Sequence, residues 1–192
     1  MTTNRSTLQL RNPALARDLV AVLAASLLLT LSAKVSVPFY PVPMTLQTFA
    51  VIGLGFALGP WRATAAVLLY LAEGAAGLPV FAGTPEKGIG LAYLLGPTGG
   101  YLLGYAPAAL LAGWAGTRRW AARPLPASLA GLLAGAVVYV PGLLWLGTVI
   151  GFDKPVLQYG LYPFILGDVT KAILAALLFV AGRAAFDAKA GR

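Results

Sequence analysis

The chain has 192 residues, of which 59% are hydrophobic and only 10% are charged, whereas a soluble domain carries about a quarter charged residues. It contains no cysteine and no histidine, which excludes disulfides, thiol nucleophiles, Ser-His-Asp triads and the usual zinc sites. The net charge of +8 comes from bases that form no run and are not interleaved with aromatic residues, so nucleic acid is not an expected partner. This composition predicts a single membrane domain over residues 1–192 that is not an enzyme.

The first apolar segment predicts a helix over residues 18–34. Its uncharged part, residues 19–33, is short for a membrane span of roughly 20 residues, but Arg17 and Lys34 can reach toward the membrane surface from its two ends. A secretory signal peptide is the alternative interpretation, because bases precede an apolar run that ends in Leu-Ser-Ala at 31–33. The poor cleavage motif and the later apolar segments, which resemble partners for this one, favour a helix of the mature protein.

A proline-rich segment follows the first helix and cannot continue it. Pro38, Pro41 and Pro43 lie within six residues, and proline removes a backbone donor and fixes φ. The segment also carries five apolar side chains that a connector in water would seldom display together, namely Val37, Phe39, Tyr40, Val42 and Met44. We therefore expect an extended loop that folds back onto the protein as a lid, rather than a plain connector.

Two further helices are predicted over residues 46–59 and 63–78, separated by a tight Gly-Pro turn. The second carries Glu73, whose carboxylate faces either a cavity or the membrane interface, and its place near the helix end favours the interface. Glycine and proline then break the pattern twice between residues 77 and 100.

The turn at residues 96–101 is a candidate for ligand contact. Non-helical backbone at membrane depth is tolerated only where it is buried in protein or lines a cavity. A phosphate-binding loop is the alternative for such a glycine-rich run, but no Gly-Lys-Ser/Thr follows it, so nucleotide binding is not expected.

Three more helices complete the predicted fold, over residues 99–115, 127–150 and 161–185, with Pro141 as an expected kink in the second of them. The turn before it, residues 117–124, is basic and flanked by tryptophan, which is typical of a cytoplasmic membrane interface.

Six helices place both chain termini on one side of the membrane, and the charges indicate which side. Ten bases fall on the side of the termini, three fall on the other side, and Lys171 lies within a span, which accounts for all 14. The ten are Arg5, Arg11, Arg17, Arg62, Arg118, Arg119, Arg123, Arg183, Lys189 and Arg192, and the three are Lys34, Lys87 and Lys154. Since cytoplasmic loops are enriched in bases, both termini are expected in the cytoplasm. The opposite connections are long and rich in proline, glycine and aromatics, so a binding mouth should face outward.

Asp168 and Lys171 form an ionisable pair inside an otherwise apolar helix. The two side chains lie about one turn apart on one helix face. Each costs roughly 3 kcal/mol or more at bilayer depth, so such residues usually mark a substrate or ion pathway. The alternative is a neutralising pair that holds helices together. Because the helix starts on the outer side, Asp168 lies roughly 10 Å deep and within reach of the outer loops, which favours a ligand site.

Four separated motifs, in this order, resemble the BioY family, the biotin-specific substrate-binding (S) components of energy-coupling factor (ECF) transporters. They are PVPMTLQT at 41–48, GLPVFAG at 77–83, LGPTGGY at 95–101 and GDVTK at 167–171. The resemblance covers roughly residues 19–185. It implies an all-α integral membrane protein with six transmembrane helices in an ECF S-component-like bundle, which resides in a prokaryotic cell membrane, contacts lipid and binds biotin from outside.

The same resemblance implies partners. A transmembrane coupling (T) protein and ABC-type ATPases supply the energy, and the absence of a Walker motif here agrees with that division. In the family, a small-xxx-small face on the first helix contacts the coupling protein. Ala21 and Ala25 match it best, with Ala24 and Leu28 as a shifted alternative. No cofactor is implied. Whether the chain acts alone or as an oligomer, and whether its energising module is dedicated or shared, stay open.

Biotin offers two ureido N–H donors, a ureido carbonyl, an apolar bicycle and chain, and a carboxylate. The resemblance makes Asp168 the acceptor and Lys171 either the cation for the carboxylate or a donor to the ureido oxygen, with both roles open. Neutral hydrogen bonds are expected from Thr45, Gln47, Tyr93, Thr98, Gly99, Gly100 and Tyr101, and apolar walls from Phe39, Tyr40, Phe81 and Tyr101. Gly83 of the second motif completes the set.

Three other functions compete with biotin capture. The same architecture could serve another small vitamin, since fold does not fix the ligand. A small membrane enzyme could use Asp168 and Lys171 as an acid/base pair, although the chain lacks histidine, cysteine and a second clustered carboxylate. A purely structural membrane protein would leave the long outer loops unexplained.

Overall fold

The computed structural model describes residues 13–190, and helices make up most of it. The helices are α1 (Pro13–Lys34), α2 (Gln47–Leu58), α3 (Pro60–Ala75), α4 (Gly90–Leu94), α5 (Gly99–Gly116), α6 (Pro124–Ile150), α7 (Val156–Gly160) and α8 (Ile165–Ala190). A 3-10 helix, η1 (Arg119–Ala122), and two strands, β1 (Ser36–Val37) and β2 (Met44–Thr45), complete the set. The prediction of a helical protein is confirmed. Arg5, Arg11 and Arg192, which entered the charge count, lie outside the described residues.

The helix boundaries differ from the predicted ones mainly at the ends. α1 starts at Pro13 rather than at residue 18, so Asp18 lies inside the helix, where its carboxylate pairs with Arg62 of α3 at 2.8 Å. α3 stops at Ala75 instead of residue 78. α8 begins at Ile165 rather than 161, because the residues before it form α7 and a turn, and it continues to Ala190 instead of 185. The short helices α4 and α7 were not predicted.

The proline-rich segment forms a narrow ribbon with a turned tip. β1 and β2 pair antiparallel, with Ser36 opposite Thr45 and Val37 opposite Met44. In the tip, Val42 is buried, and the Phe39 ring meets the Phe164 ring edge to face at 5.9 Å. The segment is therefore extended and folds back onto the protein, as predicted.

The helices pack around α5, which contacts α6, α2 and α3, while α8 closes the bundle against α6 and α2. Small residues allow this close approach. A Cβ added at Gly55 of α2 would lie 2.7 Å from the Cβ of Ala112 on α5, and Ala108, Ala109 and Ala112 are fully buried. α1 lies at the edge of the bundle, against α3 and α2.

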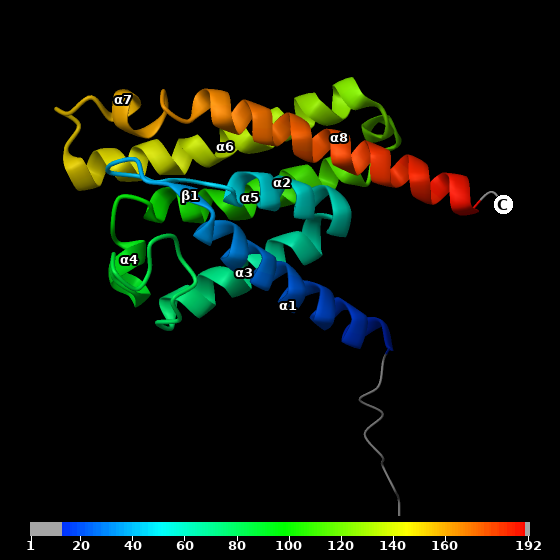
Figure 1. Cartoon of the computed structure of the whole chain (residues 1–192), viewed down its shortest axis with the longest axis horizontal. Coiled ribbons are helices and arrows are strands. Elements are labelled where there is room, and N and C mark those ends of the chain that lie inside the picture. Colours follow the sequence, from blue (N-terminus) through cyan, green and yellow to red (C-terminus); the bar gives the residue numbers. More distant parts are fainter. Residues whose placement is uncertain (1–12, 191–192) are drawn as a thin grey trace, which may run out of the picture.

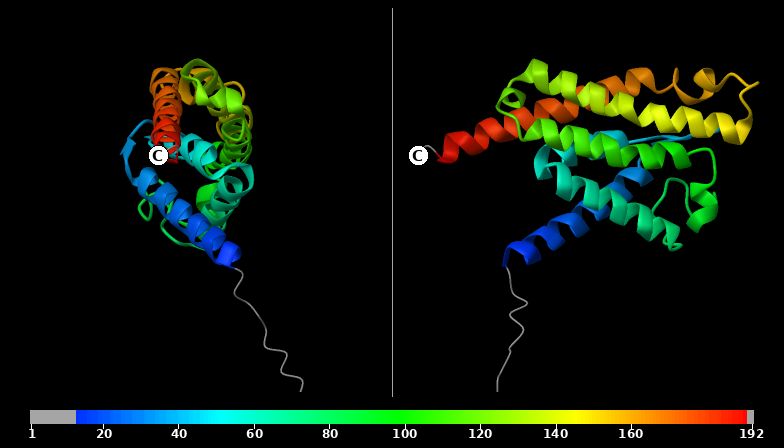
Figure 2. Two further views of the ribbon diagram at one scale, coloured as in Figure 1. Left: turned by 90° about the vertical axis from the view of Figure 1, so that its right-hand side faces the viewer. Right: turned by 180° about the vertical axis from the view of Figure 1, so that it is seen from behind.

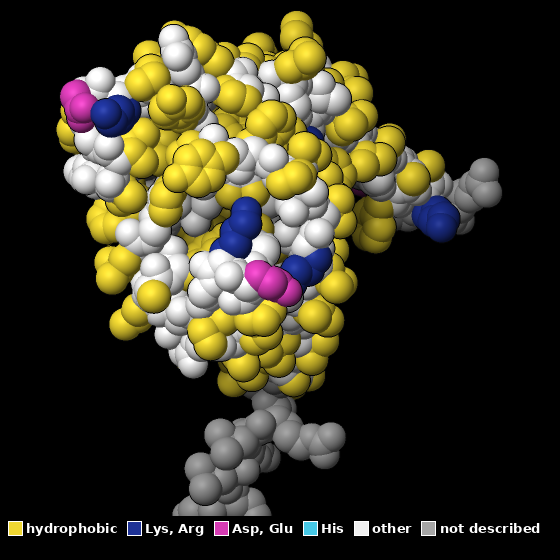
Figure 3. Space-filling model, turned by 60° about the vertical axis from the view of Figure 1, so that its left-hand side comes forward, with side chains coloured by type: hydrophobic (Ala, Val, Ile, Leu, Met, Phe, Trp, Pro, Cys, Tyr) yellow, Lys and Arg dark blue, Asp and Glu magenta, His cyan; other side chains and the backbone are white. Residues whose placement is uncertain are grey.

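The ribbon and the short helices between the long ones gather at one end of the bundle (Figures 1 and 2). The β1–β2 ribbon, α4 and α7 lie at this end, whereas the start of α1 and the end of α8 lie at the other. Figure 3 turns the connection end toward the viewer and shows a largely apolar surface with few charged side chains.

Three helices are long and apolar enough to cross a membrane by length and composition, over residues 13–34, 124–150 and 165–189. α2 is also apolar but has only 12 residues, which span about 18 Å against a bilayer core of about 30 Å. α5 and α6 run through Pro107 and Pro141 without interruption. Of these helices, α2, α5, α6 and α8 supply walls of the cavity described next.

Candidate ligand-binding site

One cavity lies where the proline-rich segment meets α2, α4, α5, α6 and α8. The space within it, including the part that is open to solvent, is about 530 Å³. Seven of the predicted site residues line it: Thr45, Gln47, Tyr93, Thr98, Tyr101, Asp168 and Lys171.

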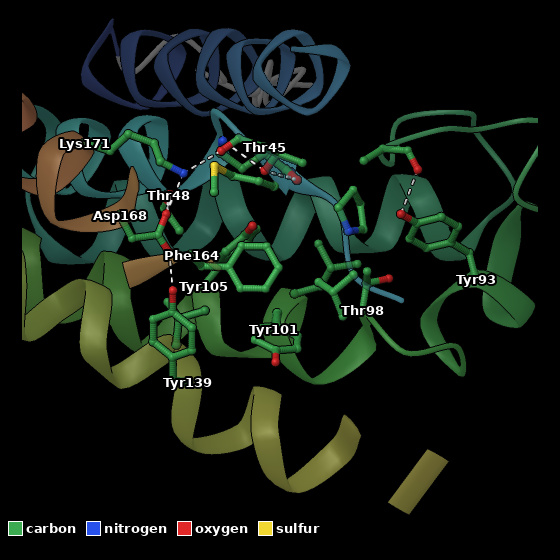
Figure 4. A pocket seen from close by; sticks show the side chains of 17 residues that line it. Thr45, Thr48, Tyr93, Thr98, Tyr101, Tyr105, Tyr139, Phe164, Asp168 and Lys171 are labelled. Atoms are coloured by element: carbon green, nitrogen blue, oxygen red, sulfur yellow. Dashed lines mark hydrogen bonds and ion pairs between the residues drawn. The ribbon is translucent and has the colours of Figure 1, made fainter. Parts of the chain in front are cut away.

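The predicted ionisable pair forms one end of this cavity (Figure 4). Lys171 Nζ lies 2.5 Å from Asp168 Oδ1, and the side chains are only 13% and 15% exposed. Both residues belong to α8, one helical turn apart, so the helix itself holds the pair together. The pair carries no net charge, which limits the cost of placing it inside the protein.

Three further groups fix the pair. Thr48 Oγ1 of α2 donates to Asp168 Oδ1 at 2.9 Å, and the Tyr139 hydroxyl of α6 donates to Asp168 Oδ2 at 2.5 Å. Lys171 Nζ also donates to the Thr45 carbonyl at 2.8 Å. A carboxylate offers about four lone-pair positions and an ammonium three N–H groups. The pair therefore keeps about one acceptor position and about one donor for a ligand.

The opposite end of the cavity is aromatic. The Tyr93 hydroxyl donates to the Ala82 carbonyl and the Tyr101 hydroxyl to the Gly160 carbonyl, both at 2.8 Å. Burial raises the pKa of the Tyr93 phenol, which therefore stays protonated as a donor. With their hydroxyls engaged by backbone, Tyr93 and Tyr101 offer a ligand their ring surfaces, while Thr98 beside them lines the same end.

Gln47 is buried and already paired. Its Nε2 donates to the Tyr70 hydroxyl at 2.7 Å, and Thr45 Oγ1 donates to its Oε1 at 3.3 Å. This network holds the start of α2 against α3 and orients the backbone carbonyl of Thr45 that binds Lys171.

The structure does not bring the other predicted aromatic residues to the cavity surface. Phe81 is fully buried behind the wall, where its ring stacks on Tyr93 at 4.9 Å. Phe39 packs against Phe164, which lines the cavity, so Phe39 supports the cavity wall without facing the cavity itself. Tyr40 is 92% exposed at the loop tip. A loop with many apolar residues has only one inner face, and the sequence does not tell which side chains occupy it.

The predicted glycines serve packing and turns. An added Cβ at Gly100 would collide with Trp145 and the Pro141 carbonyl of α6, and one at Gly99 would collide with the Leu94 carbonyl. Gly83 has φ +70, a conformation that favours glycine. None of the three lines the cavity.

Ten lining residues were missed as site residues: Thr48, Tyr105, Tyr139 and Phe164, and also Val42, Pro43, Met44, Ala82, Leu102 and Val138. Thr48 is the last residue of the first family motif, directly after Gln47, so its place in the motif was a signal that could have identified it. Tyr105 and Tyr139 lie within long apolar helices, where a buried phenol normally needs a partner. That requirement was the available signal for Tyr139.

On the first helix, Ala21 and Ala25, the two alanines predicted to contact a coupling protein, differ in exposure. Ala25 is only 3% exposed and lies against the chain's own helices. Next to it, Ser26 Oγ donates to Glu73 Oε2 at 2.5 Å, joining α1 to α3. Ala21 is half-buried, whereas Ala24 is exposed. In this conformation Ala25 is therefore unavailable to a partner, and Glu73 serves as a link between helices.

Comparison with known proteins shows what the chain is similar to. The model of the BioY family matches residues 2–188. A probable biotin transporter BioY from Pyrococcus horikoshii is 42% identical over 161 residues, covering 84% of this chain and 91% of that protein. The biotin transporter BioY of Thermotoga maritima is 36% identical over 163 residues, covering 84% and 93%.

A solved structure agrees with these sequence relatives. The S-component for biotin from an ECF-type ABC transporter superposes with a TM-score of 0.71 at 26% identity, over 90% of this chain and 94% of that one. Both the sequence match and the fold extend over nearly the whole chain. The chain therefore belongs to the BioY family.

Proposed function

We propose that the chain takes up biotin as the S component of an ECF-type transporter, binding the vitamin from the outer face. Its relatives are biotin transporters rather than enzymes, and the similar solved structure is an S-component for biotin. The observation that carries the proposal is the cavity whose one end is the Asp168–Lys171 pair and whose other walls are apolar and aromatic.

Biotin's ureido ring belongs at the charged end. Its N–H groups match the remaining acceptor position of Asp168, and its carbonyl matches the remaining donor of Lys171. A ligand carboxylate placed there would lie close to the Asp168 carboxylate, and like charges at such a distance repel strongly in a partly buried site. This argument favours Lys171 as a donor to the ureido oxygen over Lys171 as the counterion of the carboxylate.

The rest of the ligand then runs along the apolar wall. Val42, Leu102 and Phe164 line the cavity and suit the bicycle and the valeryl chain. Lys171 is the only base among the described residues that line the cavity, so the carboxylate points toward the aromatic end and the opening. Of the predicted contacts, Thr45, Gln47, Tyr93, Thr98 and Tyr101 stay in the proposed site, and Thr48, Tyr105 and Tyr139 join them.

The chain forms a single membrane domain that crosses the cell membrane six times with both termini in the cytoplasm. Support comes from the three span-length helices and from the gathering of the β1–β2 ribbon, α4 and α7 at one end (Figure 1). α2, α3 and α5 are shorter, because the ribbon and the loops around α4 fill part of the membrane depth. Such backbone is tolerated where it is buried or lines a cavity.

A coupling protein and ABC-type ATPases complete the transporter. α1 is the candidate contact because it lies at the edge of the bundle and exposes Leu19, Leu23 and Leu27. Since Ala25 is buried, the shifted register with Ala24 and Leu28 on the exposed side replaces Ala21 and Ala25 as the proposed contact face.

Calorimetry on the purified chain tests the function. Biotin should bind at one site per chain, and biotin should be found in protein purified from cells grown with it. Absence of heat on titration, together with absence of biotin in the purified protein, would contradict the proposal. Binding of another vitamin but not of biotin would assign the cavity to that ligand.

A further inference from the structure

A second feature lies at the end of the bundle away from the cavity, where α5 turns into α6. We call residues 114–123 the arginine–tryptophan turn. It carries Trp114, Arg118, Arg119, Trp120 and Arg123, and η1 lies within it. Biotin binding uses none of these residues.

The turn is fixed in shape. Ala121 is fully buried, which anchors η1 to the bundle. The Arg118 guanidinium lies 4.6 Å from the centre of the Trp114 ring, and the Trp114 and Trp120 rings meet at 6.2 Å and 61°. Arg183 of α8 adds a fourth base, because its Nη1 lies 3.4 Å from the Gly116 carbonyl and 3.5 Å from the Arg118 carbonyl.

These guanidinium groups have no anionic partner in the part of the chain that the structure describes. The ion pairs found there join Asp18 to Arg17 and Arg62, Asp153 to Lys154, and Asp168 to Lys171. The first turn of α6 contains no acidic residue either, although a helix N-terminus favours negative charge. The cluster therefore concentrates like charge that an external anion would neutralise.

We propose that the arginine–tryptophan turn binds the phosphate of an anionic membrane lipid. Trp114 and Trp120 are exposed, and tryptophan rings favour the level of the lipid headgroups. From Arg123 onward, Leu125, Leu129 and Leu133 form an exposed stripe at four-residue spacing along α6, which suits acyl chains. A cationic head site that continues into an apolar stripe matches an amphiphile better than it matches a soluble anion or a polar protein surface.

Lipid titration of the full-length protein in detergent tests the proposal, with native mass spectrometry as the readout. The test variant carries Arg118→Gln, Arg119→Gln and Arg123→Gln. The control carries Arg17→Gln, Arg62→Gln and Lys189→Gln, which removes the same charge from the same end of the bundle. Phosphatidylglycerol affinity should fall at least about tenfold in the test variant and stay unchanged in the control, whereas phosphatidylcholine should bind all proteins alike.

Four outcomes would overturn the proposal. Equal losses in both variants would indicate diffuse attraction, and no loss in the test variant would indicate no site. Glycerol 1-phosphate that binds as tightly as the lipid would make this a site for a soluble phosphate ester. Loss of a copurifying membrane protein with unchanged lipid affinity would make the turn a protein interface.

A single substitution and a biotin-binding measurement distinguish the loss of a lipid site from misfolding of the protein. Arg119→Gln alone, at an exposed position, should weaken phosphatidylglycerol binding in the same direction. Biotin binding by the same samples should not change, because the turn lies at the opposite end from the cavity. A loss of lipid binding with intact biotin binding supports the site, and unchanged lipid binding by Arg119→Gln and the triple variant contradicts it, whatever the cavity binds.

Discussion

The Asp168 carboxylate receives hydrogen bonds from two neighbouring helices, through Thr48 of α2 and Tyr139 of α6, and an ion pair from Lys171 of its own helix. An anionic group inside a membrane protein is retained only when such donors satisfy it. The same donors hold the carboxylate in place before a ligand arrives, so the proposed binding site and a helix junction share one residue.

Removing the Thr48 hydroxyl should therefore lower the stability of the protein. In Thr48→Val the shape is kept but a donor to a charged acceptor is lost, which costs about 1.5–3 kcal/mol. The control is Thr148→Val, since Thr148 is exposed and its hydroxyl bonds only within its own helix, to the Trp145 carbonyl. Thermal unfolding in detergent should show a lower Tm for Thr48→Val alone. Equal Tm values for the two variants would mean that the Thr48 bond contributes nothing.

For single residues, the sequence predicts well which charged side chains belong to the candidate site, but it predicts poorly which neutral side chains contact them. Asp168 and Lys171 stand out because ionisable residues are rare in an apolar run. Tyr139 and Thr48 meet Asp168 only through the rotation of three packed helices. A helix that is apolar all round gives no periodic signal of which face lies inside, so these contacts could not be predicted.

The helices of the bundle approach one another through small residues. α2 contains one glycine that contacts a neighbouring helix and one that does not. Gly55 contacts α5, where an added Cβ would lie 2.7 Å from the Ala112 Cβ and 3.0 Å from the Ala109 carbonyl. Gly53, two residues earlier, has nothing within 4 Å of such a Cβ. The two glycines therefore make a matched pair within one helix.

Gly55→Ala should destabilise the protein by about 1–3 kcal/mol through overpacking. Gly53→Ala should stabilise it by about 0.5–1 kcal/mol, because alanine loses less backbone entropy in a helix. Thermal unfolding of the two variants measures the difference. A stabilising effect of Gly55→Ala would show that α2 and α5 do not pack as described.

The end of α1 holds the loop that borders the cavity. Lys34 Nζ donates to the Pro79 carbonyl at 2.6 Å, the Phe81 carbonyl at 2.9 Å and the Thr84 hydroxyl at 3.0 Å. The sequence predicted only that Lys34 reaches the membrane surface. These carbonyl partners lie on a loop without regular structure, and no pattern in the sequence predicts them. The loop also contains Ala82, which lines the cavity.

Lys34→Met should accordingly weaken biotin binding although Lys34 does not line the cavity. Loss of these hydrogen bonds to a charged donor frees the loop and should reduce affinity by about 1.5 kcal/mol, or roughly tenfold. Lys154→Met, at an exposed site on another connection, should bind biotin like the unchanged protein. If calorimetry finds equal affinities for both variants, the loop does not depend on Lys34.

For the whole molecule, the proposed topology places the cavity mouth outside and the arginine–tryptophan turn inside the cell. Charge bias and loop length predicted this arrangement, and the family resemblance predicted the fold. The extent of each helix was less predictable, because α2 ends after 12 residues and, in the proposed topology, irregular backbone fills the remaining membrane depth. Such compensation depends on tertiary packing and leaves no local signal.

The chain contains no cysteine, so single cysteines report topology directly. Tyr40→Cys at the exposed loop tip should react with a membrane-impermeant maleimide in intact cells. Ala122→Cys in η1 should react only after the membrane is permeabilised. The reverse pattern would invert the proposed orientation. Labelling of both positions in intact cells would show that the two positions do not lie on opposite sides of the membrane.

The central claim is that the Asp168–Lys171 end of the cavity binds the ureido ring of biotin, and calorimetry with modified ligands tests it most directly. Blocking a ureido N–H by methylation should weaken binding at least about thirtyfold, whereas converting the carboxylate to an amide should change the affinity little. Asp168→Asn should weaken biotin binding to a similar degree as ureido methylation, and Asp153→Asn, in an exposed pair, should not. A larger loss for the amide than for the methylated ligand, or full affinity in Asp168→Asn, would contradict the assignment.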